Sequence, residues 1–157
     1  MPSRLKSDLN TRPFIKENIS IWFARLAVGL VFIVNLSCAL SFIFQPERYA
    51  AGFELAGLQG KVVVQSFGIL FLMWNATYPP VLLHPQRQMT LFAVILVQQA
   101  IGVAGETWMW LGLPPGHTAL WSTGLRFIIF DGLGLALMGA AYLLLRADQK
   151  LPSSSSR

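Results

Sequence analysis

The stretch Ile21–Phe44, which reads IWFARLAVGLVFIVNLSCALSFIF, determines the fold class of this chain. About 20 mostly apolar residues are needed to cross the hydrocarbon layer of a bilayer, about 30 Å thick, as an α-helix. The stretch carries Arg25 as its only charged residue, and Gln45 and Pro46 end it. Because it is too long for the apolar core of a signal peptide, we expect it to be retained as a membrane-spanning helix.

Three further apolar runs satisfy the same length criterion, over about 62–78, 89–110 and 119–145. Pro79 and Pro80 mark the end of the second run. The membrane part of the last run begins either at its first residue or only after Arg126. Short connections make neighbouring helices antiparallel, so the sequence predicts an all-α fold, an integral membrane four-helix up-down bundle over 21–145.

The composition agrees with a lipid bilayer as the surroundings. Hydrophobic residues make up 54% and charged residues 12% of the 157 positions, against roughly 25% charged residues in soluble domains. The net charge of +5 does not indicate nucleic acid, because the basic residues lie at the chain ends and in loops. Cys38 is the only cysteine, which excludes an internal disulfide and a cysteine metal cluster.

The basic residues also predict an orientation, because Lys and Arg are in excess in cytoplasmic segments. The basic residues on the expected inner side are Arg4, Lys6, Arg12, Lys16, Arg25, Arg87, Arg146, Lys150 and Arg157. Only Arg48 and Lys61 flank the expected outer loop. We therefore expect a multi-pass protein of the inner (cytoplasmic) membrane with a cytoplasmic 1–20 segment and a polar cytoplasmic 146–157 tail. Its last residues, Leu151–Arg157, read LPSSSSR and should be disordered.

Aromatic residues give an independent estimate of depth, because Trp and Tyr prefer the membrane interface. The inner belt would contain Trp22, Trp74, Tyr78 and Tyr142, and the outer belt Tyr49, Trp108, Trp110 and Trp121.

The outer loop 45–60 is too apolar for a free linker, so it either lies on the membrane surface or caps the bundle. In the last run, Gly132, Ala136 and Ala140 recur at four-residue spacing, which predicts close approach to another helix.

Glu106, Arg126 and Asp131 are charged residues inside predicted spans, where charge is costly. Glu106 and Arg126 lie at comparable depth on adjacent antiparallel helices, which predicts an ion pair. That pair is either a structural clasp or a site in which Arg126 anchors an anionic or carbonyl-bearing ligand while Glu106 moves a proton.

Asp131 is rotated by roughly 140° from Arg126 about the helix axis and needs another partner, either Gln98, Gln99 or a proton of its own. It is either a satisfied structural group or part of a ligand or proton path. Gln99, Gly102 and Glu106 form one polar and small stripe that faces protein or a cavity.

These positions define a candidate ligand-binding or buried polar cluster, open toward the outer side and consisting of Gln99, Glu106, Arg126 and Asp131. Its interior could also be lined by Asn35, Ser37 and Gln65.

His84 and His117 lie in loops expected on opposite sides of the membrane, so they cannot hold haem between them in one chain. No haem-attachment, phosphate-loop, nucleotide-binding or HExxH motif occurs. The sequence therefore indicates no catalytic residue, no metal site and no intrinsic cofactor, while a quinone or a lipid remains possible.

Arg25, Gly29 and Phe32 stand in the pattern R-x-x-x-G-x-x-F, and the second run contains Phe67–Leu70, reading FGIL. The pattern resembles the opening of DoxX-like membrane proteins. These are small four-helix proteins, some of them associated with thiosulfate:quinone oxidoreductase or with oxidative-stress complexes. The resemblance implies the fold and a quinone-linked context, but no catalytic residue. Leu36 and Ala39 replace the glycine and lysine that commonly follow in the family.

Two functions are therefore expected. The first is an accessory subunit or partner of a respiratory, photosynthetic or other redox membrane complex, without a redox centre of its own and bound to other membrane protein subunits. The alternative is a DoxX-like quinone-dependent oxidoreductase subunit or a small-molecule or quinone-binding membrane protein that uses the candidate cluster.

Overall fold

The computed structural model describes the backbone of residues 4–150 and the side chains of residues 19–150. Within that range the chain forms helices and turns, and it contains no strand. The helices are α1 (Arg4–Phe44), α2 (Pro46–Ala50), the short 3₁₀ helix η1 (Ala51–Phe53), α3 (Gly57–Asn75), α4 (Tyr78–Leu83), α5 (Met89–Leu111) and α6 (Thr118–Lys150).

Four helical segments of this part of the chain are long and apolar enough to cross a membrane, namely Ile19–Phe44, Gly57–Leu83, Met89–Leu111 and Thr118–Lys150. Large apolar side chains on their outer surfaces are exposed, among them Leu26, Trp108 and Leu133. Exposed apolar surface of this extent fits lipid as the surrounding solvent. The predicted all-α membrane bundle with four spans is confirmed.

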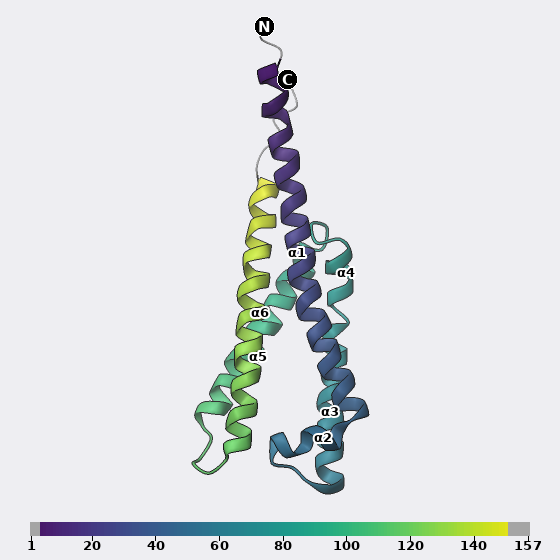
Figure 1. Cartoon of the computed structure of the whole chain (residues 1–157), viewed down its shortest axis with the longest axis vertical. Coiled ribbons are helices and arrows are strands. Elements are labelled where there is room, and N and C mark those ends of the chain that lie inside the picture. The colour runs from purple at the N-terminus through teal and green to yellow at the C-terminus, as the bar shows by residue number, and fades with distance from the viewer. Residues whose placement is uncertain (1–3, 151–157) are drawn as a thin grey trace.

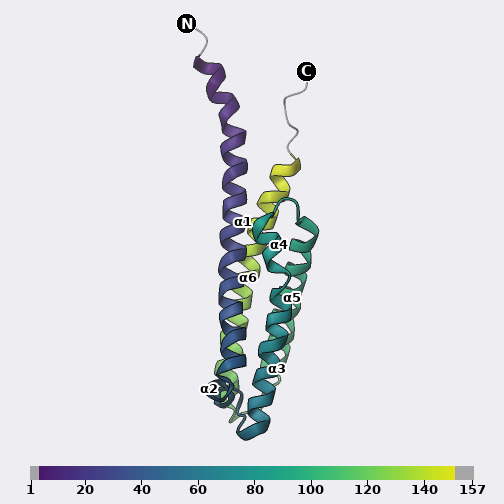
Figure 2. The ribbon, with the colours of Figure 1, turned by 90° about the vertical axis from the view of Figure 1, so that its right-hand side faces the viewer.

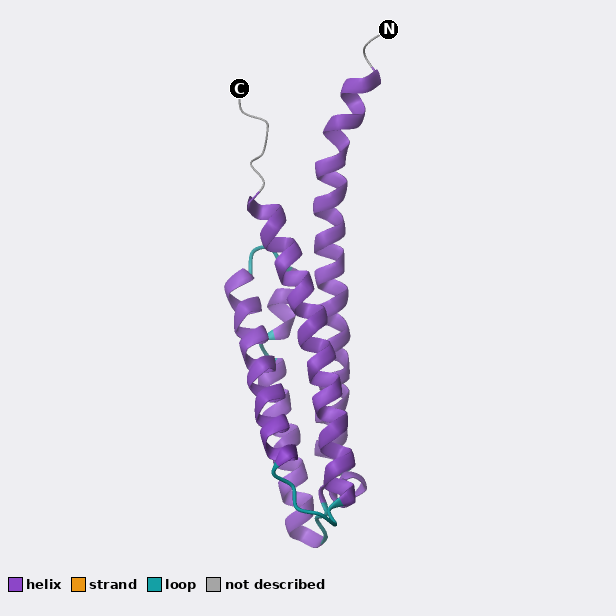
Figure 3. Cartoon of the chain, turned by 90° about the vertical axis from the view of Figure 1, so that its left-hand side faces the viewer, coloured by secondary structure: helices purple, strands orange, loops and turns teal. Residues whose placement is uncertain are grey.

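The bundle consists of two antiparallel helix pairs, α1 with α3 and α5 with α6 (Figures 1 and 2). Contacts of α1 with α6, and of α4 with α1 and α5, join the pairs near the end where α1 begins and α6 ends. We call this the closed end. Toward the opposite end the two pairs diverge, as Figure 1 shows, and we call it the open end. Figure 3 shows that helices and loops make up the whole described chain. The α2–η1 segment lies at the open end and contacts α1, α3 and α6.

The second span is broken, with α3 ending at Asn75 and α4 beginning at Tyr78. Pro79 and Pro80 lie in the first turn of α4, where the missing N–H groups cost least. The predicted boundary at about residue 78 is therefore wrong, because these prolines start a helix that continues to Leu83. At the end of α3 the Asn75 side-chain amide turns back and donates to the carbonyl of Phe71 at 2.7 Å.

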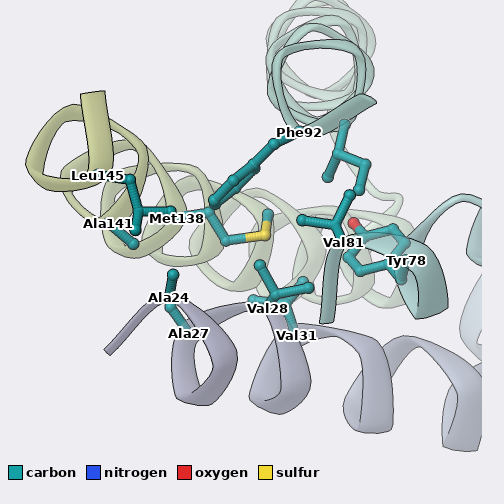
Figure 4. Close-up of a cluster of buried hydrophobic side chains, with 11 residues drawn as sticks. Ala24, Ala27, Val28, Val31, Tyr78, Val81, Phe92, Met138, Ala141 and Leu145 are labelled. Carbon is teal, nitrogen blue, oxygen red and sulfur yellow. The ribbon is translucent and has the colours of Figure 1, made fainter. Parts of the chain in front are cut away.

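The core of the closed end joins α1, α4, α5 and α6 (Figure 4). Its fully buried side chains include Val28 of α1, Val81 of α4, Phe92 of α5 and Met138 of α6. Phe92 also packs edge-on against Tyr142, with ring centroids 5.5 Å apart. This core holds the two helix pairs together at one end only, which leaves room between them at the other.

The small residues Gly132, Ala136 and Ala140 of α6 lie away from the core of the bundle. A Cβ atom added to Gly132 would meet nothing within 4 Å, and both Ala136 and Ala140 are exposed. The buried face of α6 is offset from them and includes Gly134 and Ala141. Gly132, Ala136 and Ala140 therefore lie off the buried face of α6, and their close approach to another helix stays a prediction.

The first and last helices extend beyond the predicted spans. The α1 helix begins at Arg4, within the segment 1–20 that was expected to precede the membrane, and α6 continues to Lys150. The predicted disorder of the polar tail concerns mainly residues 151–157, which lie outside the described residues.

Candidate functional site

Gln99 and Asp131 form the centre of the polar cluster between α5 and α6. The Gln99 Nε2 atom donates to Asp131 Oδ1 at 2.8 Å and to the Asp131 carbonyl at 3.3 Å. The Tyr78 hydroxyl donates to Gln99 Oε1 at 3.3 Å, and the side chain of Asn35 hydrogen-bonds the same hydroxyl. Gln99 is fully buried and is thus the partner of Asp131, which confirms one of the predicted alternatives.

Two glycines provide the space for this cluster. A Cβ atom on Gly102 would lie 3.2 Å from Cη2 of Trp74 and 3.4 Å from Oδ2 of Asp131. A Cβ atom on Gly134 would lie 3.4 Å from Nε2 of Gln99. These distances are at or below the lower limit of ordinary van der Waals contact, so a larger residue would crowd the polar side chains. The two glycines therefore leave room for these side chains where α5 and α6 cross.

The predicted ion pair between Glu106 and Arg126 does not form among the described side chains. Glu106 instead interacts with the carboxyl group of Asp131. The helical rotation between positions 126 and 131 explains the difference: Asp131 faces the polar stripe of α5, so Arg126 must face elsewhere. The carboxyl side chains of Glu106 and Asp131 thus face one another between α5 and α6.

Arg126 is exposed and lies at the wall of a cavity of about 200 Å³ that also reaches Gln99 and Asp131. We call it the polar cavity, and its lining residues are Val34, Asn35, Cys38, Phe71, Trp74, Asn75, Gln99, Arg126, Phe127, Phe130 and Asp131. Three of the four predicted site residues therefore share one cavity. Glu106 is linked to it through Asp131.

A second cavity of about 230 Å³ lies toward the open end and is mainly aromatic. We call it the aromatic cavity, and it is lined by Phe42, Phe53, Phe67, Phe71, Glu106, Met109, Trp110, Leu113, Leu120, Thr123, Gly124 and Phe127. The Phe42 ring lies 5.8 Å from that of Phe53 and 6.0 Å from that of Phe71, between centroids. Because Phe71 and Phe127 line both cavities, the two adjoin.

Several polar atoms beside these cavities have no hydrogen-bond partner within the described residues. They are Nε1 of Trp74, Oδ1 of Asn75 and Oε2 of Glu106, all buried. Buried polar groups are ordinarily paired, and an unpaired one is costly. Each of these residues lines one of the two cavities, so the site contains a donor and two acceptors that the chain itself leaves unused.

The α2–η1 segment caps the aromatic cavity, which is one of the two predicted positions of loop 45–60. Phe53 reaches the cavity wall, and the next residue, Glu54, adopts a left-handed backbone with φ of 54°. Oε2 of Glu54 lies 2.5 Å from Nδ1 of His117, and Oε1 accepts a bond of 3.4 Å from the amide of Leu120. The hydrogen bond with His117 lowers the pKa of Glu54.

Sequence reasoning missed several residues of the site and misplaced others. Tyr78, predicted at the membrane interface, is fully buried beside Gln99. Ser37 is exposed and bonds the carbonyl of Ile33, while Gln65 ties α3 to the carbonyl of Ile43, so neither lines the polar cavity. Asn75 and Tyr78 flank the helix break, and polar residues directly before a Pro-Pro pair were the available signal for it.

Fold and site together define a multi-pass helical membrane protein with a polar cluster and an aromatic cavity between its two helix pairs. Within residues 19–150 no group of three or more His, Cys, Asp and Glu side chains could hold a metal ion. No family model matches the chain, and no curated protein or solved structure matches it either.

Proposed function

We propose that this protein binds a membrane-soluble small molecule with an apolar body and an oxygen-bearing head, and that quinones are the class it takes. The observation that carries this proposal is the junction of the aromatic cavity with the polar cavity. Ligand sites are typically apolar with a few convergent polar groups, and a quinone has the matching division between ring carbonyls and tail.

The polar cavity offers suitable chemistry for the head group. Nε1 of Trp74 and the guanidinium of Arg126 are donors for a carbonyl oxygen, and Oδ1 of Asn75 is an acceptor for a quinol hydroxyl. Asp131 lines the same cavity and its neighbour Glu106 lines the adjoining one, so a pair of carboxyl groups lies beside the head group. Since each cavity is smaller than the roughly 300–1,000 Å³ of drug-sized sites, the head group and the start of the tail would be enclosed while the remainder stays in lipid.

A substitution that removes one donor tests this proposal. Trp74→Phe keeps an aromatic ring but deletes the unpaired N–H, so the affinity for a short-chain benzoquinone should fall about tenfold. Trp108→Phe is the matched control, because Trp108 is 84% exposed and lines neither the polar nor the aromatic cavity. Equilibrium binding to the purified protein in mild detergent measures both. Equal affinities of the wild type and both variants would refute the role of Trp74, and no saturable binding would refute the function.

The second candidate function is that of an accessory subunit of a redox membrane complex, and it is favoured by the exposed small-residue face of α6. Ala136 and Ala140 are exposed and a Cβ atom on Gly132 would meet nothing within 4 Å, and small residues at this spacing allow close helix packing in membranes. Ala136→Leu should release a partner subunit during purification in mild detergent. Ala100→Leu, on an exposed position of α5, should not. Recovery of the wild type without any partner from native membranes would exclude this candidate.

The proposed cellular setting is the inner membrane, with both termini cytoplasmic. The basic residues support it, because Arg25, Arg87 and Arg146 lie toward the closed end, whereas Arg48 and Lys61 flank the α2–η1 segment. Reporter fusions after Arg146 should report a cytoplasmic C-terminus. A reporter active only outside the cytoplasm would reverse the orientation of the site.

A further inference from the structure

A third cavity, of about 180 Å³, lies at the closed end where α1 meets the turn between α4 and α5. Its lining residues are Ile21, Arg25, Leu83, His84, Pro85, Gln86 and Arg87, and we call it the basic cavity. Two arginines and one histidine line it, and no acidic residue does. It has no lining residue in common with the polar cavity or the aromatic cavity.

Arg25 is held in place with part of its donor capacity unused. Its Nη2 atom donates to the carbonyl of Leu83 at 2.9 Å, and the Trp22 ring lies 5.4 Å from the guanidinium carbon. Its Nε atom is buried and has no partner among the described residues. A guanidinium has five N–H donors, so a fixed Arg25 can still bind an oxyanion.

The surroundings of the basic cavity place it at the boundary between water and lipid. Trp22, which is 60% exposed, is the kind of residue that prefers this level, and Arg87 is exposed in the turn. Leu83, which lines the basic cavity, and Leu26, which follows Arg25 on α1, are 60% and 68% exposed. A positively charged pocket suits the phosphate group of an anionic phospholipid, and the exposed apolar surface beside it suits the acyl chains.

We propose that the basic cavity binds the phosphate group of an anionic phospholipid, with Arg25 and Arg87 as its ligands and the acyl chains along Leu26 and Leu83. Charge-assisted hydrogen bonds from arginine suit phosphate oxygens, and basic pockets at membrane interfaces are sites for acidic head groups. Asp148, the acidic residue near the C-terminal end of α6, accepts a hydrogen bond from the hydroxyl of Ser20. This site is independent of the proposed quinone site, so either can fail alone.

The test is lipid binding by the full chain in detergent, measured by native mass spectrometry with phosphatidylglycerol, phosphatidylcholine and inorganic phosphate as separate probes. The wild type should retain phosphatidylglycerol at least about tenfold more strongly than phosphatidylcholine. Arg87→Gln, on an exposed turn where folding is not at stake, should abolish most of this preference. Arg146→Gln is the matched control, because Arg146 is also an exposed arginine toward this end and does not line the cavity.

The same measurement contains the outcomes that overturn the proposal. Equal losses in Arg87→Gln and Arg146→Gln would show attraction to net charge and no defined site. Equal retention of the two lipids would exclude recognition of an anionic head group. Displacement of the lipid by inorganic phosphate at equal concentration would identify free phosphate as the ligand. Arg25→Lys keeps the charge without the planar fork, and unchanged lipid retention in it would exclude Arg25 as a ligand.

Discussion

At the scale of single residues, the hydrogen bond from Gln99 to Asp131 is the contact that fixes the polar cluster. Gln99→Leu should reduce the free energy of unfolding by about 1–3 kcal/mol, because Asp131 would lose its donor while remaining buried. Unfolding of the purified protein in detergent measures the loss. Gln98→Leu is the control, since Gln98 only accepts a long bond of 3.5 Å from Thr77. Similar stability of both variants would show that the Gln99 bond is dispensable.

The contact between Glu54 and His117 predicts a dependence on pH. Because the pKa of Glu54 is lowered by this contact in the folded protein, its stabilising effect is present above the ordinary value of 4.5. It is lost as the pH falls through the lowered value. Glu54→Gln should therefore lower Tm at neutral pH and remove part of the decline in Tm between about pH 5 and pH 3. Parallel pH profiles of variant and wild type would contradict this assignment.

Spacing along the sequence could predict the partner of Asp131 but not the surroundings of Arg126. The polar stripe of α5 identified Gln99 because it depends only on the helical period. Depth in the membrane suggested that Glu106 and Arg126 would pair, whereas the direction of each side chain depends on how α6 is rotated against α5. That rotation is set by packing at residues such as Gly102 and Gly134, whose role appears only once the helices are assembled.

At the scale of helices, the close approach of α1 and α3 depends on Gly68. A Cβ atom there would lie 2.8 Å from the carbonyl oxygen of Ala39, a backbone atom that cannot move aside alone. Gly68→Ala should therefore destabilise the protein by about 1–3 kcal/mol. Gly132→Ala, where a Cβ atom meets nothing within 4 Å, should be neutral or stabilise by up to about 1 kcal/mol through helix propensity. Chemical unfolding of both variants in detergent distinguishes them, and equal effects would contradict the packing of this helix pair.

Hydropathy predicted the four spans correctly because each contains a long apolar run, but it could not reveal the break in the second span. A proline pair can end one helix or begin another, and the choice depends on whether tertiary contacts support the continuation. Here Tyr78 and Val81 of α4 are fully buried in the closed-end core, which stabilises the second piece. The break in turn brings Tyr78 to Gln99.

At the scale of the whole molecule, the site exists because the two helix pairs pack together at one end and separate toward the other. The closed-end core holds α1, α4, α5 and α6 together, while the aromatic and polar cavities lie where the pairs diverge. The α2–η1 segment closes the open end through Phe53 and Glu54. Neither cavity is fully enclosed, and the exposed Arg126 lies at the wall of the polar cavity.

Photolabelling with a short-chain benzoquinone that carries a photoreactive group tests the central claim most directly. The label should attach to peptides from the polar cavity, those containing Cys38, Phe71–Asn75 or Arg126–Asp131, and excess unlabelled quinone should suppress it. Labelling confined to lipid-facing positions such as Trp108 and Leu133, or labelling that excess quinone does not reduce, would contradict the account.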